Sequence, residues 1–295
     1  MTRLPARLSG ENQKIKMLNN SKNLKPGMVA VIGIPFDANS SFMQGPAVAP
    51  AQIRKIWNAG AINLCSESGI DLSDHPDFID LGDLKIDNGP DAIDKIESTV
   101  AELLGRDVRL ISLGGDHAIT YPILKAYRTR YQQLEILHLD AHPDLYESYG
   151  GNRYSHACPF ARIMEEKLAS RLVQMGIRTL NAHQKKQAER FRVEIIDMQN
   201  LQNPQAVDLK GPLYLSIDLD VLDPAFAPGV SHHEPGGMST RELIGIIQGL
   251  QVPLAGADIV EFNPRRDLSE ITAMVAVKIL KEVAARMLES PTNRS

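Results

Sequence analysis

The feature of this sequence that most restricts its fold is a regular alternation of two kinds of segment. Short apolar runs, of the kind that form buried strands, alternate with longer segments whose apolar residues recur at helical spacing. Such alternation is typical of βαβ units, in which helices cover both faces of a parallel sheet. The sequence therefore predicts an α/β fold with a mainly parallel sheet and helices on both faces.

Seven apolar runs are predicted to be strands. They cover residues 28–36, 108–115, 134–140, 172–178, 193–197, 213–220 and 254–264. Helices are predicted over residues 91–105 and 269–288, where apolar residues share one helical face. No composition break or low-complexity linker interrupts the pattern. We therefore expect one domain over residues 28–290, a flexible arm over 1–27 and a loose end over 291–295.

Charge and composition argue against several kinds of partner. The net charge is -4 and there is no basic run, which argues against nucleic acid. No apolar stretch approaches the roughly 20 residues that a membrane span needs. Neither Cys65 nor Cys158 lies in a CxxC motif, so a reducing compartment, the cytoplasm, is expected. Residues 1–27 are basic and lack a secretory core; they read as a solvated arm, or alternatively as the remnant of an organellar transit peptide.

Acidic and histidine residues follow three of the predicted strands, in the motifs GGDH, HLDAHPD and SIDLDVLDP. Because the carboxyl ends of parallel strands meet at one edge of a sheet, these side chains are expected to converge. Four carboxylates buried together are costly without cations, so the motifs predict a metal site. A single Asp after a strand often only caps a helix, but that explanation does not account for six residues together. The predicted ligands are His117, Asp140, His142, Asp144, Asp218 and Asp220.

The types of ligand narrow the choice of metal. Carboxylates and imidazoles without a thiolate suit Mn²⁺ better than Zn²⁺, and they leave Co²⁺, Fe²⁺ and Ni²⁺ open. Alternate residues of an extended segment point the same way, so Asp140, His142 and Asp144 share one side if the strand continues that far. Two ions roughly 3.5–4 Å apart would supply a hydroxide nucleophile. Neither Ser112, inside an apolar strand, nor Cys158 has the setting of a nucleophile.

Five motifs together resemble those of the ureohydrolases, the arginases, agmatinases and relatives that hydrolyse guanidinium groups to urea. They are GGDHAIT, HLDAHPD, YSHA, SIDLDVLDPAFAPG and EFNP, and the resemblance runs from about Gly33 to Ala285. It implies a three-layer α/β/α fold, a site for two manganese ions and a homo-oligomer, either a trimer or a hexamer.

The resemblance also implies a role for each motif residue. Asp140 and Asp218 would bridge the two ions, and the other ligands would complete them in an order that the sequence does not settle. His156, in YSHA, matches the family histidine that transfers protons, and Glu261, in EFNP, matches the carboxylate that accepts the guanidinium. The chemistry agrees, because a guanidinium donates a fork of N–H groups to a carboxylate and an imidazole can protonate an amine. The alternatives are that His156 is only a structural residue and that Glu261 only forms an ion pair.

The loop APGVSHHEPGG bears on the substrate. It resembles the VSH-x-EPGG loop of plant-type arginases and departs from the GTGTPEPGG-like loop of agmatinases. L-arginine is therefore the expected substrate, with agmatine or another guanidino acid as the alternatives. Arginine carries an α-carboxylate and so needs hydrogen-bond donors. The candidates are Ser148 and Asn152 for the carboxylate, Asn181 for the amino group and His232 for a further substrate contact.

Two other classes of protein remain as alternatives. A deacetylase on a related fold uses one zinc ion with fewer ligands, and a non-catalytic homologue is expected to have lost ligands or Glu261. The complete set of six ligands argues against both. Asp116 and His138 are expected to orient ligands without binding metal. Asp223, which precedes a proline, is expected to form a turn.

Overall fold

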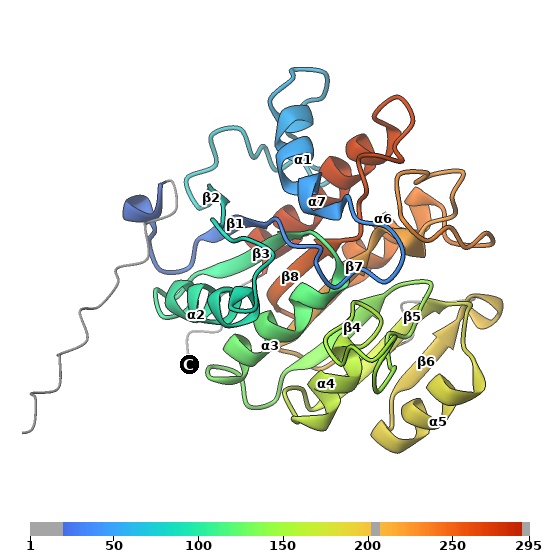
Figure 1. Ribbon diagram of the computed structural model, residues 1–295. Helices are drawn as coiled ribbons and strands as arrows, with labels where there is room; N and C mark the ends of the chain where they lie inside the picture. The colour runs from blue at the N-terminus through green and yellow to red at the C-terminus, as the bar shows by residue number, and fades with distance from the viewer. Residues whose placement is uncertain (1–19, 202–206, 291–295) are drawn as a thin grey trace, which may run out of the picture.

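One eight-stranded parallel sheet runs through the centre of the computed structural model, which describes residues 20–201 and 207–290 (Figure 1). The strand order is β2-β1-β3-β8-β7-β4-β5-β6. The strands are β1 (Val29–Ile34), β2 (Phe78–Asp83), β3 (Arg109–Gly114), β4 (Glu135–Leu139), β5 (Arg171–Ile177), β6 (Glu194–Asp197), β7 (Leu213–Asp218) and β8 (Leu254–Val260). The predicted parallel α/β architecture is confirmed.

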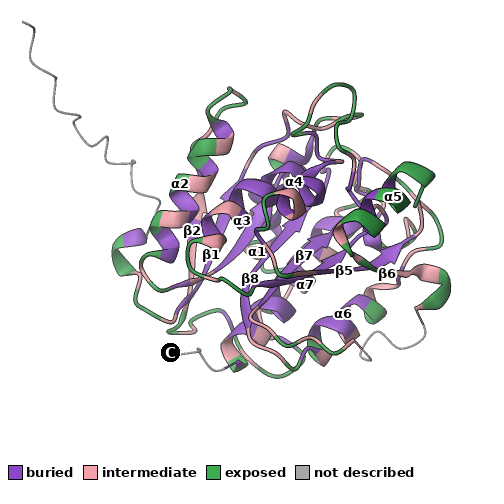
Figure 2. Cartoon of the chain, turned by 90° about the horizontal axis from the view of Figure 1, so that it is seen from below, coloured by how far each residue is buried: buried purple, intermediate pink, exposed green. Residues whose placement is uncertain are grey.

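The strands in the middle of the sheet are buried along their whole length. Every residue of β7 and β8 is buried, as expected for strands covered on both faces (Figure 2). All seven predicted strands are present. The sequence does not predict β2, whose residues are mostly half-buried. This strand is one of the two edge strands, and Asp80 and Gly82 interrupt the apolar residues of its sequence, FIDLGD.

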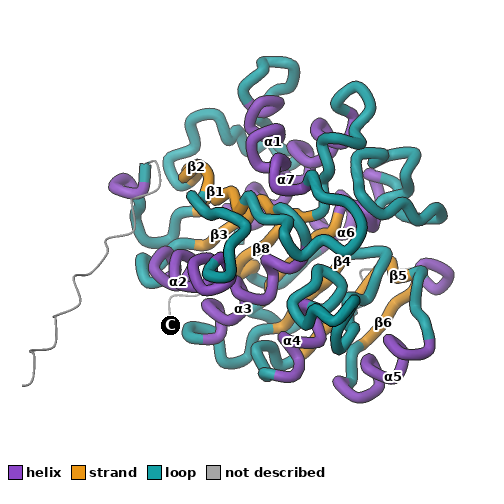
Figure 3. The backbone as a smooth tube through the Cα atoms, viewed as in Figure 1, coloured by secondary structure: helices purple, strands orange, loops and turns teal. Residues whose placement is uncertain are grey.

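Helices cover the two faces of the sheet and complete three layers. In the view of Figure 3, α1, α6 and α7 lie above the sheet, and α2, α3, α4 and α5 lie below it. Separate apolar cores fill the two sides, with Ile53, Ile247 and Val283 in one and Ile96 and Phe160 in the other. The helices are α1 (Ala49–Trp57), α2 (Ala92–Leu104), α3 (Thr120–Arg128), α4 (Pro159–Glu165), α5 (Ala182–Phe191), α6 (Thr240–Gly249) and α7 (Ile271–Glu289). The two predicted helices correspond to α2 and α7.

Polar side chains define where helices α5 and α6 begin. Ser239 and Glu242 form a capping box before α6: the Ser239 hydroxyl accepts the N–H of Glu242 at 3.2 Å, and the Glu242 carboxylate accepts the N–H of Ser239 at 2.7 Å. Asn181 caps α5 by accepting the N–H of Gln184 at 3.0 Å. These caps satisfy N–H groups that have no partner inside a helix.

The described part of the predicted N-terminal arm lies against the domain. Ser21 is buried, its carbonyl accepts a hydrogen bond from Arg106 at 3.1 Å, and the N–H of Gly27 donates to the carbonyl of Asp107 at 2.7 Å. The rest of that arm, residues 1–19, and the predicted loose end at 291–295 lie outside the described residues. Among the helices that the structure describes, none combines the length and the apolar character needed to span a membrane.

Candidate active site

Four neighbouring strands bring the predicted site residues to one edge of the sheet. In the order β3-β8-β7-β4, these strands are adjacent and parallel, so their carboxyl ends lie side by side. His117 follows β3, and Glu261 follows β8 directly. Asp218 is the last residue of β7, and Asp140 comes directly after β4. The sheet therefore brings together residues that are up to 144 positions apart in the chain.

A tight turn carries His117 from the end of β3. Gly115 passes so close to the neighbouring loop that a Cβ atom on it would lie 1.7 Å from the carbonyl oxygen of Phe36. This contact explains the glycine before the DH pair. Asp116 then accepts the N–H of Ala118 at 3.1 Å and begins a short 3-10 helix whose first residue is His117.

Three carboxylates converge on Nδ1 of His117. This atom lies 3.2 Å from Oδ2 of Asp140, 3.2 Å from Oδ2 of Asp144 and 3.3 Å from Oδ2 of Asp218. It is buried, and no described group forms a well-directed hydrogen bond with it. A nitrogen lone pair and three carboxylate oxygens that face one another in this way form a donor set that fits a divalent cation.

The opposite side of the His117 ring supports this interpretation. Nε2 lies 3.0 Å from the hydroxyl of Ser216, and that hydroxyl lies 2.7 Å from a carboxylate oxygen of Asp258. A carboxylate can only accept, so the hydroxyl donates to Asp258 and accepts from Nε2–H. The proton of a neutral His117 is therefore on Nε2, which leaves Nδ1 free to bind a metal.

Asp140 links this group to a second one, around His142. Its Oδ2 faces His117, whereas its Oδ1 lies 3.4 Å from Nδ1 of His142. The same nitrogen of His142 is 3.0 Å from Oδ2 of Asp220. Asp140, His142 and Asp220 place ligand atoms close enough together to hold an ion. The division of Asp140 between two histidines is what a bridging carboxylate requires.

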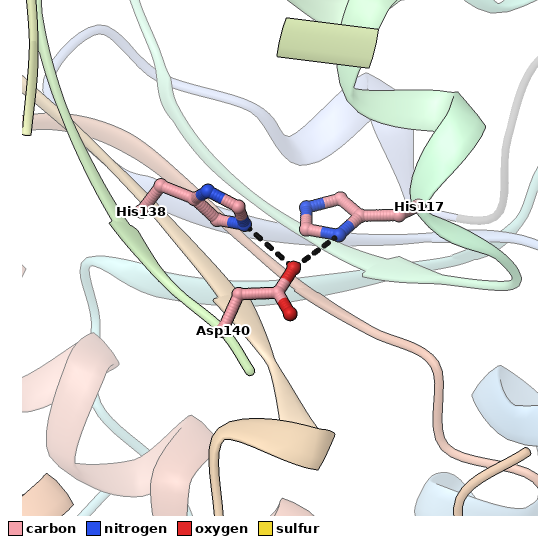
Figure 4. Close-up of side chains that lie close together, drawn as sticks. All are labelled: His117, His138 and Asp140. Atoms are coloured by element: carbon pink, nitrogen blue, oxygen red, sulfur yellow. Dashed lines mark hydrogen bonds and ion pairs between the residues drawn. The ribbon is translucent and has the colours of Figure 1, made fainter. Parts of the chain in front are cut away.

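His138 also lies within metal-binding distance of His117 and Asp140 (Figure 4). Its Nε2 is 2.7 Å from Oδ2 of Asp140, and its Nδ1 is 3.0 Å from the amide nitrogen of Gln174, which also donates to the carbonyl of Pro143 at 2.7 Å. Since the amide nitrogen donates, Nδ1 accepts and the ring proton is on Nε2. A protonated Nε2 donates to Asp140 and cannot bind a metal, so this geometry favours the predicted orienting role.

The backbone reaches this arrangement by a different route from the predicted one. Strand β4 ends at Leu139 and does not continue in extended form through the DAHPD motif. Asp144 has φ 49°, in the left-handed region, and residues Leu219–Val221 form a 3-10 turn between Asp218 and the following loop. Short turns therefore orient the aspartate side chains toward the site. The expected alternative was an extended strand, in which alternate side chains point the same way.

Burial and mutual repulsion make the cluster unfavourable as a set of bare charges. Burial raises the pKa of Asp218 well above its ordinary value, and the nearby Asp220 and Asp140 raise it further. Burial likewise raises the pKa of Asp220 to about 6. Asp140 is the opposite case: burial opposes its ionisation, but His138 and His117 outweigh burial and lower its pKa. A cation would relieve the repulsion among these carboxylates.

His156 and Glu261 meet beside the carboxylate cluster. Nδ1 of His156 lies 2.8 Å from Oε1 of Glu261, which also accepts the backbone N–H of His117 at 2.8 Å. Burial alone would lower the pKa of His156, but the Glu261 carboxylate raises it to about 9. Glu261 has φ 63°, which is uncommon for a residue other than glycine, and strained backbone of this kind is concentrated at functional sites.

A cavity of about 200 Å³ opens over these groups. His232 is part of its wall: the ring centroid lies 5.4 Å from that of His156 and 5.8 Å from that of His142. Asp223 organises the loop that carries His232 by accepting the N–H groups of Ala225 and Gly236, in line with its predicted turn. The cavity is lined by Ser41, His142, Asp144, Tyr146, Tyr149, His156, Ala157, Thr179, Gln184, Asp218, Asp220, His232 and Glu261.

Three residues predicted to contact the substrate are not among those that line the cavity. Ser148 is exposed on the surface. The side chain of Asn152 donates to Asn39 at 3.0 Å and accepts the N–H of Tyr154 at 2.9 Å. The side chain of Asn181 caps α5 and donates to the hydroxyl of Tyr146. These hydrogen bonds use the polar groups of both asparagines within the protein.

The sequence did not indicate several residues that line the cavity. Thr179 could have been found, because it comes shortly after strand β5 at the same edge of the sheet. Tyr146 and Tyr149 lie within the loop where substrate contacts were expected. Gln184, only 3% exposed, carries no motif that marks it, and nothing in the sequence around Ser41 indicated a place in the cavity. They reach the cavity through tertiary packing.

Comparisons with known proteins agree with the motifs. A model of the arginase family matches residues 28–285. Arginase 1, mitochondrial, of Arabidopsis thaliana is 42% identical over 300 residues, covering 96% of this chain and 86% of that protein. An agmatinase of Bacillus cereus is 31% identical, covering 90% of this chain and 94% of that protein. The solved structure of an arginase from Medicago truncatula has a TM-score of 0.82 and 40% identity, covering 88% of this chain and 87% of that chain.

Proposed function

This chain belongs to the arginase family, and from that premise we propose that it hydrolyses L-arginine to L-ornithine and urea. The observation that carries the proposal is the cavity whose floor combines the carboxylate cluster with His156 and Glu261. Identity of 42% to a plant arginase, against 31% to an agmatinase, favours arginine over agmatine. Membership of this family also argues against the zinc deacetylase alternative.

Two Mn²⁺ ions are the proposed cofactors. His117, Asp144, Asp140 and Asp218 would hold one ion, and His142 and Asp220 would hold the other together with the shared Asp140 and Asp218. Nδ1 of His117 supports this assignment, because it faces three carboxylates and forms no well-directed hydrogen bond with any described residue. The donor set also contains no thiolate. When bound, a pair of such ions lowers the pKa of water, so that hydroxide is available near neutral pH.

Glu261 is the proposed acceptor for the guanidinium group. Its Oε1 already accepts from His117 and His156, which leaves Oε2 to receive an N–H of the substrate. The guanidinium is positively charged near neutral pH. A carboxylate at this position both orients the group and offsets its repulsion from the metal ions.

His156 is the proposed proton-transfer residue. It lies in the cavity wall, and its ring is held between Glu261 on Nδ1 and Ser41 on Nε2. A residue in this position can protonate the departing amine of ornithine. His232, next to it in the cavity wall, is the proposed additional substrate contact. Burial lowers the pKa of its ring, which favours a neutral hydrogen-bonding group there. Ser148, Asn152 and Asn181 are not part of this proposal, because they do not line the cavity.

The proposal extends to assembly and location. A homo-oligomer, a trimer or a hexamer, is proposed from the family resemblance alone. The cytoplasm is the proposed location, with an organelle as the alternative. The alternative has support, because Arabidopsis relatives carry the names mitochondrial and chloroplastic/mitochondrial. Sedimentation of the purified protein and fractionation of cells test these two points.

Urea release from L-arginine and from agmatine, measured side by side with added Mn²⁺, tests the main proposal. We expect kcat/KM to be higher for arginine by more than about tenfold, which corresponds to more than about 1.4 kcal/mol. Equal or better turnover of agmatine would overturn the substrate and leave the metal chemistry in place. If no urea is released from either substrate, the proposed enzymatic activity is contradicted and a non-catalytic homologue is favoured.

A further inference from the structure

A serine hydroxyl lies on the side of His156 that faces away from Glu261. The hydroxyl of Ser41 is 2.7 Å from Nε2 of His156, and the backbone N–H of Ser41 is 3.1 Å from the same atom. The His156 side chain is only 8% exposed, whereas Ser41 is an exposed residue in the cavity wall. Nδ1 of His156 therefore faces a buried carboxylate, and Nε2 faces a residue in contact with solvent.

Hydrogen bonds hold in place the two residues that directly precede Ser41. Oδ2 of Asp116 accepts the N–H of Asn39 at 3.1 Å and the hydroxyl of Ser40 at 3.1 Å. The carbonyl of Asn39 accepts the backbone N–H of His156 at 3.1 Å. The segment that leads into Ser41 is thus tied to Asp116 and to the backbone of His156 by bonds in which the serine hydroxyl takes no part.

The two contacts of Ser41 differ in which form of the imidazole they suit. A backbone N–H can only donate, so it suits the neutral ring with a bare Nε2. A hydroxyl can both donate and accept, so it suits the neutral ring and the imidazolium equally. The hydroxyl is therefore the group that can stay bonded while a proton moves on or off Nε2.

We propose that Ser41 is the residue through which His156 exchanges protons with the solvent. The inference rests on the proposed function, in which His156 transfers a proton during hydrolysis. In the charging direction, a dissolved buffer acid gives its proton to Oγ of Ser41 while the original Oγ–H proton moves to Nε2. One O–H bond forms as the other breaks, and the products are the buffer base and an imidazolium. The reverse step discharges the ring.

The other ionisable groups around His156 are less suited to this exchange. Glu261 is buried and already accepts two hydrogen bonds. Burial lowers the pKa of His232, and its Nε2 is buried without a hydrogen-bond partner among the described residues. Asp116 and Asp144 act on His156 through their charge. Of the described residues, Ser41 is the one that bonds to Nε2.

The test is the dependence of arginine hydrolysis on buffer concentration in Ser41→Ala, at constant pH and ionic strength. This variant keeps the backbone N–H and loses the hydroxyl. We expect kcat to fall on the order of tenfold in dilute buffer, with KM nearly unchanged, and to recover as imidazole is added, because a small diffusible acid can replace the relay. Ser41→Gly is expected to behave in the same way, and Ser41→Thr, which keeps a hydroxyl, is expected to resemble the unmodified protein.

Ser40→Ala is the matched control, since it removes the neighbouring hydroxyl, which bonds to Asp116. Its kcat is expected to show no dependence on imidazole. The inference would be overturned if Ser41→Ala and Ser41→Gly kept full kcat in dilute buffer, or if their loss did not respond to imidazole. Failure of the unmodified protein to release urea would instead count against the proposed function, which separates the two failures.

Discussion

Asp140 is the residue that joins the two halves of the carboxylate cluster. Its oxygens face different histidines, His117 and His142, and it is completely buried. Asp140→Ala is therefore expected to lose at least one of two bound Mn²⁺ ions, which elemental analysis of the purified variant measures. Asp116→Asn is the matched control: Asp116 is equally buried but bonds to loop N–H groups, so both ions should remain. Two full equivalents in Asp140→Ala would contradict the bridging assignment.

Glu261 acts on the substrate by charge as well as by shape. Glu261→Gln keeps the size of the side chain but removes the charge-assisted hydrogen bond, which is worth about 1.5–3 kcal/mol. We expect kcat/KM for arginine to fall by about 10- to 100-fold or more while metal content is unchanged. Glu135→Gln, a buried carboxylate at the opposite end of strand β4, should retain activity. Loss of metal from Glu261→Gln would instead place this residue among the ligands.

For single residues, the sequence was informative where a reactive residue lies at the end of a strand or shortly after it. His117, Asp140, Asp218 and Glu261 all belong to this group, because a parallel sheet brings its strand ends together. Ser41 and its contact with His156 could not be predicted, since they depend on how one loop folds over another. The left-handed backbone conformation of Asp144 and Glu261 was not predicted either. Residues other than glycine rarely have a positive φ, so their identity gives no sign of one.

Helix α6 illustrates how an element begins at a defined residue. Ser239 and Glu242 satisfy each other's backbone N–H groups before its first turn. Ser239→Ala is expected to lower the free energy of unfolding by about 1 kcal/mol, measured by denaturant titration. Ser98→Ala, at an exposed position inside α2, is the control and should change it by less than about 0.5 kcal/mol. If both variants lower the free energy of unfolding by the same amount, the capping box does not stabilise the protein.

The existence of elements was more predictable than their ends. The central strands are marked by continuous apolar runs, because both of their faces are buried. Strand β2 was missed because Asp80 and Gly82 interrupt its apolar residues, which an edge strand tolerates since it is less buried. The condition set for the motif after β4, that the strand continues through it, is not met: the strand ends at Leu139. Local propensity cannot report such an end when tertiary contacts, such as the bond from the N–H of Ala141 to Asp220 at 3.1 Å, determine it.

For the molecule as a whole, metal and pH should act on stability together. Burial raises the pKa of Asp218 and raises that of Asp220 to about 6 in the metal-free protein. The folded state then holds protons that the unfolded state releases, so for Asp220 stability is lost as the pH rises from about 4 to about 6. Mn²⁺ replaces these protons, and it should therefore raise the melting temperature more at about pH 8 than at about pH 5.

Melting curves with Mn²⁺ and with a chelator, recorded at both pH values, measure this effect. Asp220→Asn is the matched variant, because it removes one of the raised carboxyl groups and should flatten the pH dependence of the metal-free protein. An increase in melting temperature with Mn²⁺ that is equal at the two pH values, or larger at the lower one, would contradict the expected competition between metal and protons.

The position of β8 has a consequence for how the protein is made. Of the strands that the structure describes, β8 comes last in the chain, yet it lies between β3 and β7 in the middle of the sheet. Before residues 254–260 emerge from the ribosome, the other strands can form only two separate half-sheets. Each half-sheet has an exposed edge that can pair with other chains. One half carries His117 and the other carries the aspartates. Until β8 closes the gap, the nascent chain cannot bring His117 to the aspartates, and the edges of its half-sheets remain open to aggregation.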